Sequence, residues 1–217
     1  MVSGTVENLS CGVDEAGRGP VIGPMVVSIV CGDPDDFRRM GARDSKALSP
    51  QARERLYGKI IENSRFHMIR IISASELNAL MDRINLNQIE EQAYSGLISE
   101  SPFGCEHYVD SFDVDENRLS RKLSEMTGRK VVCRHRADSL YPAVSAASIL
   151  SKVTRDREIE KLSERYGNLG SGYPADPVTR EFILASLRQG KDISGITRTH
   201  WKTFKDLLKE SRSTKLF

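Results

Sequence analysis

The sequence lacks the features of several common protein classes. No apolar run approaches the roughly 18 residues that a membrane-spanning helix requires. The first ten residues contain no basic segment followed by an apolar stretch, so we do not expect a secretion signal. The net charge of +2 is too small to indicate a nucleic-acid binder by itself. These absences favour a cytoplasmic protein without a membrane partner.

Familiar motifs built on cysteine, histidine, serine or glycine are missing as well. The cysteines are Cys11, Cys31, Cys105 and Cys133. They form no CxxC unit, and we expect reduced thiols because no secretion signal is present. The histidines have no zinc spacing, and no GxSxG serine elbow occurs. Gly17-Arg18-Gly19 lacks the spacing of a dinucleotide loop, and Pro20 and Pro24 would interrupt the helix that such a loop needs.

Acidic residues stand where strands are expected to end. Asp14 and Glu15 follow a predicted strand, and Asp110 and Asp138 hold comparable positions. Such acids can simply cap a turn. Buried carboxylates, however, need partners or a metal, and no lysine stands beside these in the sequence. Because neighbours on a strand face opposite sides, Asp14 and Glu15 can share one ion only if the strand ends or twists there. The four acids predict a site for a hard divalent cation.

The hydrophobic patterns predict an α/β fold, in which a mixed sheet of about five strands is flanked by helices. The predicted strands are 6–13, 25–31, 66–72, 106–112 and 130–135. The predicted helices are 50–62, 87–98, 116–126, 178–189 and 201–211, with others beginning near 75 and 142. Small residues on the helix after Pro142 indicate tight packing on the sheet. We expect a catalytic domain at 1–190 and a C-terminal helical extension at 191–217.

Two further segments suggest contacts with a substrate. The glycine- and proline-rich loop 167–177 carries Tyr173. Residues 191–217 hold seven Lys or Arg against three Asp or Glu, a local balance of +4. Such a segment can be a solvated helix or can hold a phosphate backbone. Together with the acids and the glycine-arginine loop, these features favour phosphodiester hydrolysis, in which two divalent ions activate water and stabilise the leaving oxygen.

The ordered motifs resemble ribonuclease HII, a type 2 ribonuclease H, and most closely its archaeal members. The matching motifs are Asp14-Glu15-Ala16-Gly17-Arg18-Gly19-Pro20, Asp44-Ser45-Lys46, Val109-Asp110, Ala137-Asp138-Ser139, 145–156 and Gly170-Ser171-Gly172-Tyr173-Pro174. They extend from about residue 9 to Trp201. The resemblance implies an RNase H-like fold and an endoribonuclease that cuts RNA in RNA–DNA hybrids and 5′ of single ribonucleotides in duplex DNA. The products would carry 5′-phosphate and 3′-hydroxyl ends.

The resemblance also implies roles for single residues. Asp14, Glu15, Asp110 and Asp138 would be catalytic and would bind two Mg²⁺ or Mn²⁺ ions. Gly17, Arg18 and Gly19 would contact the ribose 2′-hydroxyl, which separates RNA from DNA. Tyr173 would stack on the adjoining deoxyribose, although a tyrosine packed within its loop is the alternative. Ser45 and Lys46 would contact the substrate. Asp156 also lies in a matching motif, but because it is four or five helical turns beyond Asp138 we expect a helix-surface or salt-bridge residue and not a metal ligand.

Other functions remain open at this point. A junction resolvase of the same fold would share the carboxylates but would not need a loop that reads the 2′-hydroxyl. A non-catalytic module would bind hybrids and leave them intact. We expect a monomer, and a replication clamp is a possible partner that the sequence does not reveal.

Overall fold

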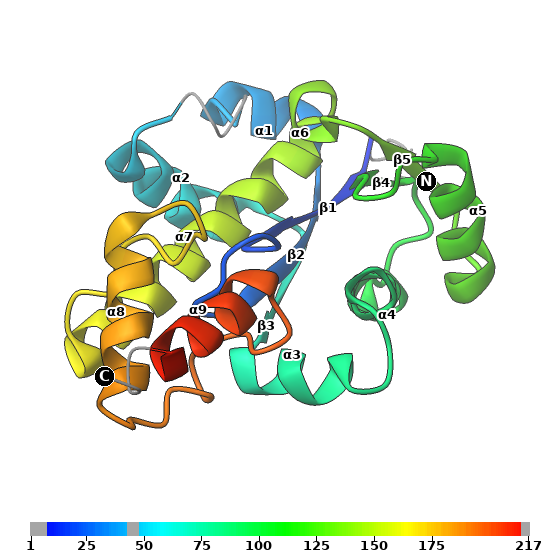
Figure 1. Ribbon diagram of the computed structural model, residues 1–217. Coiled ribbons are helices and arrows are strands. Elements are labelled where there is room, and N and C mark those ends of the chain that lie inside the picture. The colour runs from blue at the N-terminus through cyan, green and yellow to red at the C-terminus, as the bar shows by residue number, and fades with distance from the viewer. Residues whose placement is uncertain (1–7, 43–47, 214–217) are drawn as a thin grey trace, which may run out of the picture. The chain divides into compact units, whose positions relative to one another are not determined.

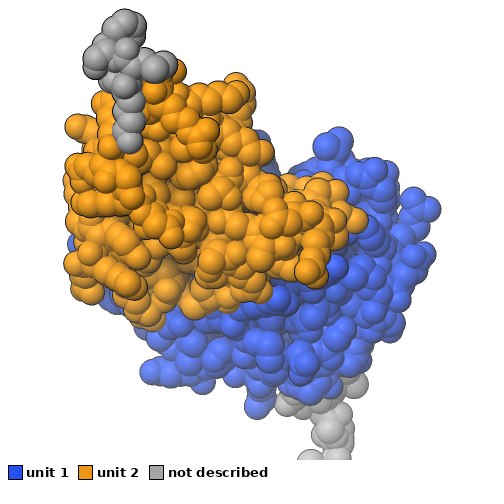
Figure 2. Space-filling view, turned by 60° about the horizontal axis from the view of Figure 1, so that its bottom comes forward, with its two compact units in different colours: residues 1–16, 26–70, 90–153 blue, residues 17–25, 71–89, 154–217 orange. Residues whose placement is uncertain are grey.

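The computed structural model of this chain describes residues 8–42 and 48–213. The chain divides into two compact units, coloured separately in Figure 2. Unit 1 consists of residues 1–16, 26–70 and 90–153, and unit 2 consists of residues 17–25, 71–89 and 154–217. Each unit is therefore assembled from three separate stretches of the chain.

Five strands form one mixed sheet, in the order β3-β2-β1-β4-β5 (Figure 1). Strand β1 (Ser10–Ala16) pairs antiparallel with β2 (Met25–Gly32) and parallel with β4 (His107–Asp110). Strand β4 pairs parallel with β5 (Val131–Arg134), and β3 (Phe66–Ile72) lies at the opposite edge. The predicted mixed sheet of five strands is confirmed.

Helices make up most of the remaining described chain. They are α1 (Pro34–Met40), α2 (Pro50–Asn63), α3 (Ala74–Met81), α4 (Leu86–Glu100), α5 (Glu116–Thr127), α6 (Ala137–Leu140), α7 (Pro142–Tyr166), α8 (Pro177–Arg188) and α9 (Lys202–Ser213). The flanking helices and the C-terminal helix are as predicted, whereas the short α1 and α6 were not expected. None of the helices in the described ranges is long and apolar enough to cross a membrane.

The core of unit 1 lies where the first half of α7 meets the sheet. A Cβ added at Gly12 on β1 would lie 2.1 Å from the Ala143 carbonyl carbon, so only glycine allows this approach. The buried cluster combines Val30, Phe37, Leu56, Ile60, Ala143, Ala146, Ala147, Ile149, Leu150 and Val153. The predicted small-residue face of this helix is confirmed, and it brings α7 directly over β1.

The core of unit 2 is built from α8, α9 and the segments around them. Its buried residues are Val21, Ile22, Leu169, Ile183, Ile193, Ile196, Phe204 and Leu207. An isolated antiparallel bridge joins Ile22 to Thr197. Residues 193–207, which belong to the predicted basic extension, thus contribute apolar side chains to a hydrophobic core.

One expectation about the cysteines is wrong. Cys11 and Cys31 form a disulfide, although reduced thiols were predicted. The reason is the strand register: the two residues are direct partners across β1 and β2, with Cα atoms 4.0 Å apart. Cys105 and Cys133 are free thiols.

Candidate active site

Strand β1 continues through both of its acids and does not end before them. Asp14 is paired with Ser28 and Glu15 with Val27 of β2. The predicted end of this strand at residue 13 is therefore wrong. The break follows at Gly17, which has φ +87°. Because side chains alternate along a strand, Asp14 and Glu15 are directed to opposite faces of the sheet.

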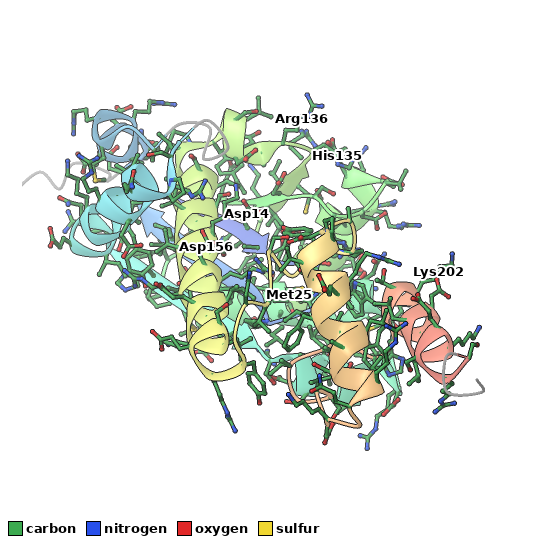
Figure 3. The ribbon with its side chains drawn as sticks, turned by 60° about the vertical axis from the view of Figure 1, so that its left-hand side comes forward. Asp14, Met25, His135, Arg136, Asp156 and Lys202 are labelled. Carbon is green, nitrogen blue, oxygen red and sulfur yellow. A yellow bond between two sulfur atoms is a disulfide. The ribbon has the colours of Figure 1, made fainter. Side chains whose placement is uncertain are left out.

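Asp14 is buried, 4% exposed, on the face that α7 covers (Figure 3). The Ser148 side chain hydrogen-bonds the Asp14 carboxylate, and Lys152 Nζ donates to Ser148 Oγ over 2.9 Å. Ser151 Oγ donates to the Asp14 carbonyl oxygen over 3.0 Å. No lysine stands beside the acids in the sequence. In the fold, however, Lys152 lies near Asp14, because it follows Ser148 by one turn of α7.

Glu15 has its partner on the other face. Tyr94 Oη on α4 donates a hydrogen bond to Glu15 Oε2. Tyr94 is fully buried, and its ring meets Phe112 edge-on with 5.5 Å between the ring centroids. A buried ring thereby fixes one carboxylate oxygen of Glu15.

Asp110 and Asp138 are connected through the start of α6. Asp110 is the last residue of β4, and its Oδ1 accepts a hydrogen bond from the Ala137 amide over 2.8 Å. Arg136, at φ +56°, turns the chain from β5 into α6. Asp138 follows in the first turn of α6, 4% exposed, and lines a cavity of about 280 Å³. The Asp110 carboxylate is thus hydrogen-bonded to the residue that directly precedes Asp138.

The electrostatics of these acids fit a cation. Burial raises the pKa of Asp14 well above its ordinary value, and the nearby Glu15 and Asp110 raise it further. The pKa of Tyr94 is raised by burial and by the same three carboxylates. Among the described residues, no three Cys, His, Asp or Glu side chains already surround a single point. Carboxylates that repel one another, two of them buried, nevertheless form a donor set suited to Mg²⁺ or Mn²⁺.

Unit 2 brings the predicted glycine-arginine loop and the tyrosine loop together. Gly17 is confined, because an added Cβ would lie 2.5 Å from Arg155 Cδ and 2.7 Å from the Pro24 carbonyl oxygen. At Gly19 an added Cβ would meet only Tyr173 Cε1, at 3.8 Å. The Tyr173 ring is 46% exposed, with the Arg155 guanidinium 5.4 Å from its centroid. Tyr173 is therefore not packed away inside its loop.

Comparisons with known proteins agree with this arrangement. The family model described as Ribonuclease HII matches residues 11–204. The chain belongs to the ribonuclease HII family. The ribonuclease HII of Thermoplasma volcanium is 49% identical over 97% of this chain and 99% of its own. The ribonuclease H2 structure from Pyrococcus horikoshii has a TM-score of 0.87 and 37% identity, and covers 94% of this chain and 99% of its own.

A second solved structure is the complex of PCNA with ribonuclease HII from Archaeoglobus fulgidus, with a TM-score of 0.84 and 43% identity. It covers 89% of this chain and 95% of that one. The RNase H-like fold is thereby confirmed. As a member of the ribonuclease HII family, this chain is a ribonuclease H enzyme, and the family's activity is cleavage of the RNA strand in RNA–DNA hybrids.

The structure bears differently on the remaining residues predicted for this ribonuclease HII family member. Asp44, Ser45 and Lys46 lie outside the described residues. Asp156 is exposed on α7, as a helix-surface residue would be (Figure 3). Sequence reasoning missed Tyr94, Ser148 and Lys152. The spacing of Ser148 and Lys152 by one helical turn was a usable signal, whereas Tyr94 looked like an ordinary core residue of its helix.

Proposed function

We propose that this chain cuts the RNA strand of RNA–DNA hybrids and also cuts on the 5′ side of single ribonucleotides embedded in duplex DNA. The proposed mechanism uses two divalent ions and leaves 5′-phosphate and 3′-hydroxyl ends. The observation that supports it most strongly is the buried carboxylate of Asp14, which is repelled by the neighbouring Glu15 and Asp110. Such repulsion is costly unless cations neutralise it.

In this proposal Asp14, Glu15, Asp110 and Asp138 hold the ions. When bound, two Mg²⁺ or Mn²⁺ ions activate a water and stabilise the leaving oxygen of an in-line displacement. The surrounding residues keep the carboxylates oriented. Tyr94 holds one oxygen of Glu15, and the Ala137 amide holds one oxygen of Asp110. Lys152 polarises the Ser148 hydroxyl that contacts Asp14.

Substrate recognition is assigned to the second group of predicted residues. Gly17, Arg18 and Gly19 would contact the 2′-hydroxyl, and the exposed ring of Tyr173 would stack on the next sugar. From the family resemblance, Ser45 and Lys46 would contact the nucleic acid. Exposed lysines on α9 would hold phosphates. A sliding clamp is a candidate partner, because the A. fulgidus relative was solved with PCNA.

A cleavage assay tests the proposed function. The purified chain is incubated with Mg²⁺ or Mn²⁺ and three duplexes of equal sequence: a hybrid, a DNA duplex with one ribonucleotide, and an all-DNA duplex. We expect cleavage of the first two and none of the third. Cleavage of the all-DNA duplex would favour a resolvase-like nuclease. Binding without cleavage of any duplex would favour a non-catalytic module.

Tyr173→Ala tests whether the tyrosine reads the RNA-to-DNA junction. Loss of one stacking contact costs about 1–3 kcal/mol, or about one to two decades in rate. We expect that loss in kcat/KM on the single-ribonucleotide duplex. A smaller loss is expected on a long hybrid, where the sugar that follows the recognised ribonucleotide always carries a 2′-hydroxyl. Equal losses on both substrates would mean that Tyr173 positions the backbone in general.

A further inference from the structure

Residues 17–23, which we call the reading loop, are held on one side by residues 193–201 of unit 2. The Gly23 amide donates to the Ile196 carbonyl over 2.9 Å, and the Arg198 amide donates to the Val21 carbonyl over 2.8 Å. Asn78 in turn fixes the supporting segment through the Thr197 carbonyl and the Thr199 amide. The backbone of the reading loop is thus anchored to a segment that lies about 180 residues later in the sequence.

The Arg198 side chain makes the strongest of these connections. It is fully buried, and its guanidinium donates to three carbonyl oxygens of the reading loop. Nε donates to Gly23 over 3.0 Å, Nη1 to Arg18 over 3.0 Å and Nη2 to Gly17 over 2.6 Å. Within the described residues Arg198 has no carboxylate partner. Backbone carbonyl oxygens therefore take the place of water around its charge. Burial, together with Arg155, lowers the pKa of Arg198 to about 9, which leaves it a cation at neutral pH.

Trp201 adds a fourth donor to the same side of the loop. Its Nε1 donates to the Gly19 carbonyl over 3.1 Å, and the Arg198 guanidinium lies 4.9 Å from the Trp201 ring centroid. The carbonyls of Gly17, Arg18 and Gly19 are therefore all directed to Arg198 or Trp201. Because these three successive carbonyls all bond to side chains on one side of the loop, the orientation of their peptide planes is fixed.

The direction of these carbonyls determines where the loop amides lie. In a planar trans peptide, a carbonyl and the following N–H point in opposite directions, and this chain has no cis peptide among its described residues. The N–H groups of Arg18 and Gly19 follow the Gly17 and Arg18 carbonyls, so they point away from Arg198. Pro20, which follows the Gly19 carbonyl, has no N–H. Two adjacent donors consequently face away from the buried cation.

We propose that Arg198, assisted by Trp201, is a positioning residue for ribonucleotide recognition: it turns the peptide planes of the reading loop so that the Arg18 and Gly19 amides are presented to the ribose 2′-hydroxyl. This inference rests on the proposed function, which assigns the 2′-hydroxyl to this loop. Arg198 itself does not bind the nucleic acid, because it is fully buried and its donors are engaged with the loop.

The test uses binding selectivity, measured in the cleavage-deficient Asp14→Asn background. Dissociation constants are determined for two duplexes that differ by one 2′-hydroxyl, an all-DNA duplex and its single-ribonucleotide counterpart. The variants are Arg198→Lys, which keeps the charge but loses the planar fork, and Trp201→Phe, which keeps an aromatic ring but loses the indole N–H donor. Arg180→Lys on the exposed face of α8 is the matched control.

We expect Arg198→Lys to lower the selectivity for the ribonucleotide by about tenfold, since a hydrogen bond from a charged donor contributes about that factor. Trp201→Phe should lower it by a smaller factor, and affinity for the all-DNA duplex should stay constant. A loss of folded protein would weaken binding to both duplexes equally and leave their ratio unchanged. If Arg198→Lys has a much lower melting temperature than the parent, the selectivity of Trp201→Phe is used to test the proposal instead.

Two failures can be told apart. If the Asp14→Asn parent binds both duplexes equally, the proposed function of the loop fails before any variant is considered. If the parent prefers the ribonucleotide and both variants keep that preference, the positioning role of Arg198 is overturned while the proposed function stands.

Discussion

At the scale of single residues, the candidate active site depends on which side of one strand each acid occupies. Asp14 is directed to α7 and its Ser148 contact, whereas Glu15 is directed to α4 and Tyr94. Protein partners therefore fix the orientation of each carboxylate, and Asp14 Oδ1 also accepts a hydrogen bond from the Glu15 amide over 2.7 Å. The cost is electrostatic, because the buried carboxylate of Asp14 is repelled by Glu15 and Asp110. Removing one charge should relieve that cost and abolish the chemistry.

Asp14→Asn separates stability from activity. The pKa of Asp14 is raised, so its ionised form opposes folding of the metal-free protein as pH rises above the ordinary carboxyl range. We expect the variant to melt at a higher temperature than wild type in EDTA at pH 7. Cleavage should fall more than about a hundredfold, since a bound ion supplies several kcal/mol of transition-state stabilisation. Asp156→Asn, on the exposed surface of α7, is the control and should retain activity. Near wild-type turnover of Asp14→Asn would contradict the metal site.

The acids stand out in the sequence as candidate ligands, whereas their partners from distant parts of the chain do not. Carboxylates after apolar runs are conspicuous because burial makes them costly. Tyr94, by contrast, meets Glu15 from 79 positions away, and Arg198 meets Gly17 from 181 positions away. Such partners depend on how helices and loops pack. Tyr94 is one apolar residue of its helix and Arg198 one basic residue of the C-terminal segment, so the sequence does not single out either one. The extent of β1 was missed for a similar reason, because pairing with β2 extends the strand through both acids.

At the scale of elements, Gly17 and Gly19 of the reading loop have different conformational and spatial requirements. Gly17 has φ +87° and no space for a Cβ, so Gly17→Ala should destabilise the fold. Gly19 has room for a side chain, because the atom nearest to an added Cβ, Tyr173 Cε1, lies 3.8 Å away. We expect Gly19→Ala to melt like wild type but to lose about tenfold or more in kcat/KM on the single-ribonucleotide duplex, because a methyl group hinders close approach of the ribose. A wild-type rate for Gly19→Ala would remove Gly19 from the recognition surface.

The tyrosine loop depends on one carboxylate, Asp176. It accepts hydrogen bonds from the Ser171 amide over 2.6 Å and from the Val178 amide over 2.9 Å, where it also caps α8. These bonds lower its pKa from 3.8 to about 2. A lowered carboxyl pKa stabilises the fold above the unfolded value near 4, and this stabilisation is lost as pH falls towards 2.

Asp176→Asn should therefore melt at a lower temperature than wild type at pH 6, and the difference should shrink between pH 4 and pH 2. Thermal unfolding followed by circular dichroism across this range measures it. A difference that does not change with pH would mean that the carboxylate charge is not what stabilises the loop.

At the scale of the whole molecule, the C-terminal segment combines a structural part with a charged surface. Phe204 and Leu207 of α9 are buried in the core of unit 2, and Arg198 supports the reading loop. Removing everything after Gly190 would therefore damage the fold of unit 2. The exposed lysines of α9 are the part that can be altered without touching this core. Lys205 and Lys209 are four residues apart on one helix face, and neither forms an ion pair with another described residue.

Lys205→Gln with Lys209→Gln tests whether this surface holds phosphates. Each lost phosphate contact should make the dependence of log affinity on log salt shallower by about 0.9, so the pair should change the slope by about 2. Turnover at saturating hybrid should remain as in wild type, because the lysines are assigned to binding alone. The matched control is Arg55→Gln with Lys59→Gln, an equally spaced basic pair exposed on α2, which removes the same net charge. If the α9 variant keeps the salt dependence of wild type, its lysines do not contact phosphates. Equal changes of slope in both variants would indicate a general effect of net charge.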